Sequence, residues 1–121
     1  MQSFLPILLL TLAIMAPTAA QAGGSTKADE QAGSLLFRDK GCSHCHGVGG
    51  IGTKKGPALT SLSKDKLWTP EKITQQILNG GQKMPPFSES LTDSEAAQLV
   101  AYLRAKHKPA PPPEPAASPV R

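Results

Sequence analysis

Apolar side chains recur at helical spacing in three stretches of the chain, and each stretch is bounded by residues that start or stop helices. The first predicted helix covers about 28–39. Thr26 suits the N-cap position, Asp29 follows three residues later, and Gly41 lies just beyond the end. The stripe that this helix is expected to bury consists of Ala28, Ala32, Leu35 and Leu36.

The second predicted helix covers about 70–79 and begins at a proline. Thr69 is the expected N-cap, and Pro70 occupies the first helical position, where its missing N–H leaves no hydrogen bond unmade. Gly80 and Gly81 end the helix. The apolar residues around it are the staple pair Trp68 and Ile73 and the inward-facing Ile77 and Leu78.

The third predicted helix has the strongest start signal. Thr92-Asp93-Ser94-Glu95 has the form of a capping box, in which the threonine and glutamate side chains each bond the other residue's backbone N–H. The helix is expected to end near 104–108, where cations suit a helix C-terminus. Its predicted buried face consists of Ala96, Leu99, Val100 and Leu103.

Between the helices lie two loops, about 47–57 and 82–90, that are long for a small domain. No stretch of the sequence alternates apolar and polar residues as a strand does. The predicted fold class is therefore all-α, with three main helices and long loops that wrap around something.

The two ends of the chain are not expected to join the folded domain. Residues 1–16 carry no charged side chain, and Ala20-Gln21-Ala22 has small residues where a signal peptidase cleaves. We interpret 1–22 as a signal peptide, 23–108 as the folded domain and 109–121 as a disordered, proline-rich tail. Export to the periplasm follows, with no membrane span after signal removal. Because no Lys or Arg precedes the apolar run, the alternative is an uncleaved membrane anchor.

Charge narrows the range of partners. The 121 residues include 13 basic and 9 acidic side chains, which gives a formal net charge of +4. The lysines are spread along the chain with few aromatic residues beside them, and this pattern argues against nucleic-acid binding. The basic surface fits attraction to an acidic protein surface, and it fits equally well a protein that is simply soluble.

Cys42-Ser43-His44-Cys45-His46 contains the C-x-x-C-H pattern of covalent haem attachment. Side chains three and four residues apart lie on one face of a helical turn, so Cys42 and Cys45 can form thioethers to one porphyrin while His46 reaches the iron. A folded unit of about eighty residues also needs such a staple, because its own core is small. A disulfide between the two cysteines would close only a tiny loop.

Two other interpretations of the cysteine pair are weaker. A structural zinc site needs four ligands with suitable spacing. The sequence contains no third cysteine, and the only further histidines are His44 and His107. A thioredoxin-like dithiol needs a βαβ context, which the predicted elements lack. The predicted cofactor is therefore one covalently attached haem c with its iron.

The second axial position of the iron has two candidate ligands. Met84 lies in a Gly- and Pro-bounded loop between two helices, where a side chain can be directed at a buried metal. His107 lies at the end of the last helix beside the tail, where a solvated histidine is expected. We predict His46 and Met84 as the metal ligands, with ordinary core packing as the alternative for Met84.

With these residues in view, the sequence resembles the class I c-type cytochromes, small mono-haem carriers, over about 28–106. Gly33 and Phe37 match the first-helix pair that packs against the last helix in that family. Leu99 and Tyr102 match their partners. The resemblance therefore implies the cytochrome c fold, with the helices and loops wrapped around one haem.

The resemblance also implies roles for individual residues. Cys42 and Cys45 match the attachment residues, and His46 matches the proximal ligand. In Gly56-Pro57-Ala58-Leu59, the carbonyl of Pro57 matches the acceptor of a hydrogen bond from that histidine. The remaining matches are Trp68, as a donor to a haem propionate or as plain packing, and Met84, as the distal ligand.

Ligation by both His46 and Met84 leaves no open position on the iron. The expected function is therefore one-electron transfer between Fe(II) and Fe(III), without enzymatic activity. The expected partners are an oxidase, reductase or dehydrogenase with an acidic docking surface. One alternative is a subunit tethered to a membrane dehydrogenase or oxidase, and a less favoured one is a gas-binding or peroxidase-like haem protein. The lysines expected at the haem edge are Lys54, Lys55 and Lys83.

Overall fold

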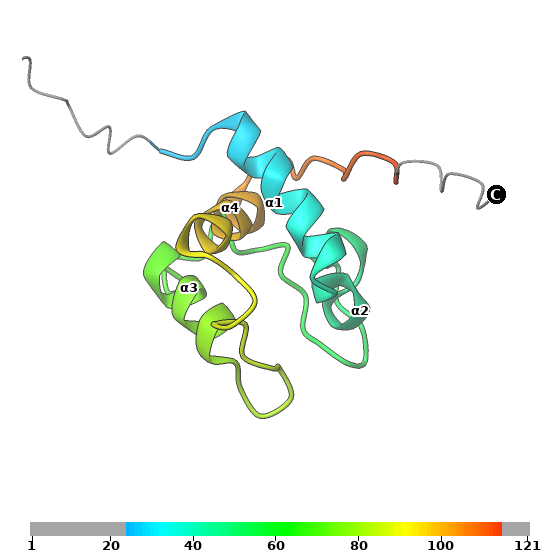
Figure 1. The fold of residues 1–121 in the computed structure, drawn as a ribbon, viewed down its shortest axis with the longest axis vertical. Helices are drawn as coiled ribbons and strands as arrows, with labels where there is room; N and C mark the ends of the chain where they lie inside the picture. Colours follow the sequence, from blue (N-terminus) through cyan, green and yellow to red (C-terminus); the bar gives the residue numbers. More distant parts are fainter. Residues whose placement is uncertain (1–23, 115–121) are drawn as a thin grey trace, which may run out of the picture.

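The computed structural model describes residues 24–114, so the predicted signal peptide and the last tail residues lie outside the described part of the chain. No strand occurs within residues 24–114, which confirms the all-α prediction, and no helix there is long and apolar enough to cross a membrane. The elements in chain order are α1 (Lys27–Asp39), α2 (Cys42–His46), the 3-10 turn η1 (Val48–Gly50), α3 (Pro70–Asn79) and α4 (Asp93–Arg104) (Figure 1).

The three long helices begin at the threonines that the sequence indicates. Thr26 and Asp29 form a full capping box, with the Thr26 N–H donating to the Asp29 carboxylate at 2.9 Å. Thr92 and Glu95 form the second box, with the equivalent bond at 2.8 Å. Thr69 caps α3 by accepting from the backbone N–H of Lys72. Side-chain capping satisfies donors that a helix leaves free in its first turn.

The first and last long helices cross in close contact (Figure 1). Gly33 permits this approach, because a Cβ at that position would lie 2.6 Å from the Cβ of Tyr102. One turn further along α1, the rings of Phe37 and Tyr102 pack with their centroids 5.3 Å apart. Tilted aromatic pairs at this distance stabilise a core beyond the area that they bury. The pairing of Gly33 and Phe37 with the last helix is as expected.

The buried face of α1 differs from the stripe that apolar spacing predicted. Its buried residues are Gly33, Ser34 and Phe37, whereas Ala28 is exposed and the other predicted positions are half-buried. Ser34 can face the core because its hydroxyl donates to the carbonyl of Gln31 at 2.7 Å. A close helix crossing needs small residues at its centre, and a count of apolar positions does not detect them. On α4 the prediction is correct, since Ala96, Leu99, Val100 and Leu103 are all buried.

The loop between η1 and α3 is fastened to the end of α4 by Arg104. Its Nη1 donates to the carbonyls of Leu62 at 3.1 Å and Trp68 at 2.5 Å. The sequence indicated Arg104 only as a cation near a helix C-terminus. In the fold, this guanidinium bridges two points of a long loop and closes it over the core.

The first residues of the proline-rich tail lie along α1. Segment 109–114 has no regular secondary structure, as its prolines predict. The carbonyl of Ala110 accepts from Gln31 at 3.1 Å, and the carbonyl of Pro112 accepts from Arg38 at 2.7 Å. These two bonds join the start of the tail to the outer side of the first helix.

Candidate functional site

A cavity of about 610 Å³ lies between the helices and the two long loops. Its volume is within the range of roughly 300–1,000 Å³ that small-molecule and cofactor sites occupy. Apolar side chains from α3, α4 and the loops form most of its wall. All six residues that the sequence singled out line it: Cys42, Cys45, His46, Pro57, Trp68 and Met84.

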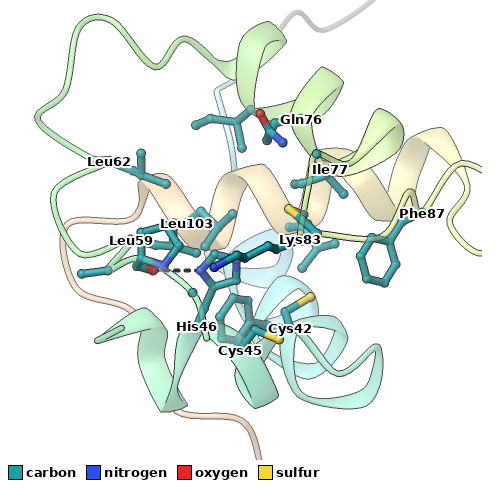
Figure 2. Close-up of a pocket in the computed structure, with 18 of the residues that line it drawn as sticks. Cys42, Cys45, His46, Leu59, Leu62, Gln76, Ile77, Lys83, Phe87 and Leu103 are labelled. Atoms are coloured by element: carbon teal, nitrogen blue, oxygen red, sulfur yellow. Dashed lines mark hydrogen bonds between the residues drawn. The ribbon is translucent and has the colours of Figure 1, made fainter. Parts of the chain in front are cut away.

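Both cysteines and the adjacent histidine enter the cavity from one short helix. Cys42, Cys45 and His46 belong to α2, and all three are partly buried (Figure 2). His44, within the same turn, is exposed and is not part of the lining. The helical turn therefore separates the motif into a cavity face and a solvent face, as the spacing of the motif predicts.

A hydrogen bond fixes the orientation of the His46 ring. Its Nδ1 lies 2.8 Å from the carbonyl oxygen of Pro57, and Figure 2 marks this bond with a dashed line. A carbonyl can only accept, so Nδ1 must be the protonated nitrogen. Nε2 is then left with its lone pair, which is the arrangement that a metal-ligating imidazole requires.

The two thiols suit covalent attachment better than binding of a bare metal ion. Burial raises the pKa of the Cys42 thiol, and this opposes the thiolate form that a zinc ligand needs. Within residues 24–114, no three His, Cys, Asp or Glu side chains are grouped so that they could hold an ion. Both cysteines are free thiols. The structure thus argues against the zinc interpretation on the donor set alone.

Trp68 lies on the loop that precedes α3 and is half-buried against the core. The ammonium of Lys72 lies 4.9 Å from the centre of its ring, within the range of a cation–π contact. The backbone of the tryptophan is held by Arg104. The first contact holds the ring of Trp68 and the second holds its backbone at the cavity wall.

Two sets of hydrogen bonds near the site have no signal in the sequence. Thr53 donates to the carbonyl of Cys45 at 2.5 Å, although it lies in a Gly-rich loop that indicates only irregular structure. Arg104 reaches across to the loop around Trp68. Hydrogen bonds from side chains to distant carbonyls depend on the folded path of the chain, and no local motif encodes them.

The cavity fits a haem. Two thiols on one face of a turn match the two vinyl groups of a porphyrin, and the imidazole beside them has a free Nε2. Other parts of the wall supply a thioether from Met84 and apolar side chains such as Ile77 and Leu103. A flat, largely apolar cofactor fixed at one edge is the ligand that this combination accommodates.

The fold and the site together define a c-type cytochrome. Residues 28–103 match the family described as cytochrome c oxidase, cbb3-type, subunit III, and the chain belongs to this family. Its class I c-type cytochrome character, expected from the resemblance, is confirmed. The chain is an electron-transfer haem protein with haem c bound covalently through Cys42 and Cys45.

Two relatives are similar over more than half of this chain. Cytochrome c6 of Leptolyngbya boryana is 36% identical over 81 residues, which cover 63% of this chain and 91% of that protein. A cytochrome bc1 complex cytochrome c subunit of Corynebacterium diphtheriae is 36% identical over 91 residues, or 71% of this chain and 31% of that protein. The match thus covers most of the cytochrome c6 and a minor part of the bc1 complex subunit.

Solved structures give the same class. Cytochrome c6 from the diatom Phaeodactylum tricornutum superposes with a TM-score of 0.50 at 30% identity, over 62% of this chain and 90% of that one. The c-type cytochrome XoxG from Methylobacterium extorquens AM1 gives a TM-score of 0.56 at 26% identity, over 69% of this chain and 56% of that one. Both support the cytochrome c fold.

Proposed function

We propose that this haem protein is a one-electron carrier whose iron is held between His46 and Met84. The observation that carries the proposal is that both side chains line one cavity. The bond to Pro57 leaves Nε2 of His46 as the donor atom. His107, the competing candidate for the second position, is exposed and is not part of the lining.

The loop that carries Met84 is anchored at both ends. The N–H of Gly81 donates to the carbonyl of Met84 at 2.8 Å. Further along, the N–H groups of Phe87 and Ser88 donate to carbonyls in the last turn of α3 at 3.1 and 3.2 Å. The end of a helix has free acceptors there, so the loop takes up bonds that the helix cannot make for itself. A fixed loop keeps the thioether in one position when the redox state changes.

The haem supplies a one-electron Fe(III)/Fe(II) couple when bound, and the chain sets its properties. A methionine sulfur as axial ligand raises the reduction potential. Apolar side chains of the cavity, including Ile77, Leu99 and Leu103, exclude water and act in the same direction. With one imidazole and one thioether at the iron, no position is left for a substrate. We therefore infer a carrier and not an enzyme.

Lysines at the cavity define the side from which a partner approaches. Lys55 and Lys83 line the cavity and are exposed, whereas Lys54, which precedes Lys55 in the chain, is exposed but does not line the cavity. Attraction between these cations and acidic residues of a redox protein would speed the encounter at low salt. Charge reversal in a Lys55→Glu, Lys83→Glu protein should slow electron transfer and flatten its salt dependence. An unchanged salt dependence contradicts this docking surface.

The family match suggests a second candidate function, a subunit held at a membrane complex. The family description names an oxidase subunit, and one relative is a bc1 complex subunit. We favour a diffusible carrier in the periplasm, because the cytochrome c6 relative is matched over nearly its whole length. Separation of soluble and membrane fractions from cells that express the full chain decides between the two. Recovery with the membranes supports the tethered subunit.

Spectroscopy of the purified protein tests the ligand pair. The oxidised protein should show the weak sulfur-to-iron charge-transfer band, and the reduced protein should not bind carbon monoxide at neutral pH. Met84→Ala should abolish the band, lower the potential and allow carbon monoxide to bind. His107→Ala is the matched control and should change none of these. Binding of carbon monoxide to the unaltered protein would favour the gas-binding alternative.

A further inference from the structure

The loop that follows η1 turns back onto the end of α2. The N–H of Gly52 donates to the carbonyl of His46 at 2.6 Å, and the hydroxyl of Thr53 donates to the carbonyl of Cys45 at 2.5 Å. A helix of five residues cannot satisfy its own last carbonyls, so this loop does so. The approach is close: a Cβ at Gly56 would lie 2.9 Å from the Cys45 carbonyl oxygen.

Thr53 contributes the side chain through which the loop bonds to α2. Its hydroxyl oxygen, while donating to Cys45, accepts from the N–H of Lys55 at 3.0 Å. The N–H of Thr53 donates to the carbonyl of Gly56 at 2.9 Å. The hydroxyl of Thr53 therefore makes one hydrogen bond within the turn 53–56 and another to α2, the helix that carries the cysteines.

The residue directly after this turn is Pro57, whose carbonyl accepts from Nδ1 of His46. The ring of proline fixes φ and so removes one of the two backbone rotations between the turn and this carbonyl, which means that the position of the turn limits where the carbonyl can lie. The His46 imidazole therefore donates to the Pro57 carbonyl, whose location depends on how firmly the turn 53–56 is held against α2.

We propose that Thr53 is a positioning residue for His46, acting through the turn 53–56 and the carbonyl of Pro57. This inference rests on the proposed role of His46 as the proximal ligand. A carbonyl that accepts from Nδ1–H increases the basicity of the opposite nitrogen. A more basic imidazole stabilises the ferric state. Thr53 therefore holds the reduction potential below the value that a loosely held histidine would give.

The test compares three variants of the haem-loaded protein. Thr53→Val removes the hydroxyl and keeps the shape, Thr53→Ser keeps the hydroxyl, and Thr60→Val alters an exposed threonine of the same loop. Thr53→Val should raise the reduction potential by less than about 59 mV, the equivalent of a tenfold change for one electron. Hydrogen exchange at Nδ1 of His46, followed by NMR, should become faster in this variant. Thr53→Ser and Thr60→Val should match the unaltered protein in both measurements.

A merely structural role predicts a different result. In that case Thr53→Val lowers the urea midpoint but leaves the potential and the Nδ1–H exchange unchanged, and this outcome overturns the proposal. If Thr53→Val yields no haem-loaded protein, Thr53→Ala provides the same comparison without a branched apolar group. Failure of the proposed ligand pair would appear separately, as an abnormal spectrum of the unaltered protein before any variant is compared.

Discussion

The α1–α4 crossing and the walls of the cavity are built in different ways. At the crossing, Gly33 lies directly against Tyr102, and Ser34 and Tyr102 are at most 2% exposed. Around the cavity, large apolar residues such as Trp68, Met84 and Leu59 are only partly buried. The helix crossing is therefore packed by the protein's own residues, whereas the side chains around the cavity need the haem to complete their packing.

The size of the cavity shows how strongly the second region depends on the cofactor. Without a ligand, the apolar side chains around this cavity of about 610 Å³ have no packing partners on one side, and such lost contacts weaken a fold. Water would fill part of the space, but it cannot replace the contacts that the apolar walls make with a porphyrin. The haem therefore functions as the core of this half of the molecule.

The largest expected effect is loss of the haem. A Cys42→Ser, Cys45→Ser protein cannot form thioethers, and we expect it to lack a stable native state at 25 °C. Hydrogen exchange should show residual protection in α1 and α4, because their contact needs no cofactor, and little protection in segment 51–88. His44→Ala, in the solvent-facing part of the same motif, should retain the haem. Equal protection of both regions in the haem-free protein would contradict the contrast between them.

The second effect concerns the crossing. Gly33→Ala places a Cβ against the backbone of Gln98 and against Tyr102, and neither can move without separating the helices. Overpacking at such a site costs about 3 kcal/mol. Urea unfolding of the haem-loaded protein should show this loss, with the haem spectrum unchanged. Gly24→Ala is the control, because nothing lies within 4 Å of a Cβ there. A stability equal to that of the unaltered protein would show that the helices can separate at little cost.

The sequence predicted the elements of both regions well, because their signals are local. Thr26, Thr69 and Thr92 start helices through bonds made within three residues, and a capping pattern reports such bonds directly. The cysteine motif likewise places its side chains within one helical turn. The six residues expected to hold the haem line the cavity, and short-range spacing together with the family resemblance had selected them.

The failures concern contacts between distant segments. Apolar spacing misplaced the buried face of α1 because Gly33 and Ser34 are not apolar positions. The family resemblance indicated Gly33, but nothing in the sequence indicated Ser34. The bonds of Thr53 and Arg104 depend on where a loop passes in three dimensions. The contact of the tail with Gln31 joins residues 79 positions apart in the chain. Spacing rules contain no information on such pairs.

Arg104 links the two regions, and its removal should have an intermediate effect. Arg104→Met keeps the apolar stem and loses the bonds to the carbonyls of Leu62 and Trp68. Hydrogen bonds from a charged donor contribute about 1.5–3 kcal/mol, so we expect a loss of about 2 kcal/mol. Hydrogen exchange should increase in segment 62–68 and not in α1. Lys106→Met, at an exposed position nearby, serves as the control. Unchanged exchange in the segment would mean that the loop is held by packing alone.

The smallest expected effect is the pH dependence of the capping boxes at the ends of the crossing helices. The Thr92 N–H lowers the pKa of the Glu95 carboxyl below its ordinary 4.5, with Lys40 adding to the effect, and the Thr26 N–H lowers the pKa of Asp29 below 3.8. Because the pKa is lower in the folded than in the unfolded protein, the stabilisation is complete above the unfolded-state pKa and is lost as pH falls through the folded-state pKa.

The test is Glu95→Gln, which keeps the capping geometry without the charge. Its urea midpoint should fall slightly below that of the unaltered protein at pH 6, and the two should converge below pH 4.5. Glu89→Gln, in the exposed loop before α4, should give no such convergence. A constant difference between the Glu95→Gln and unaltered proteins across this range would show that the charge at the cap contributes nothing.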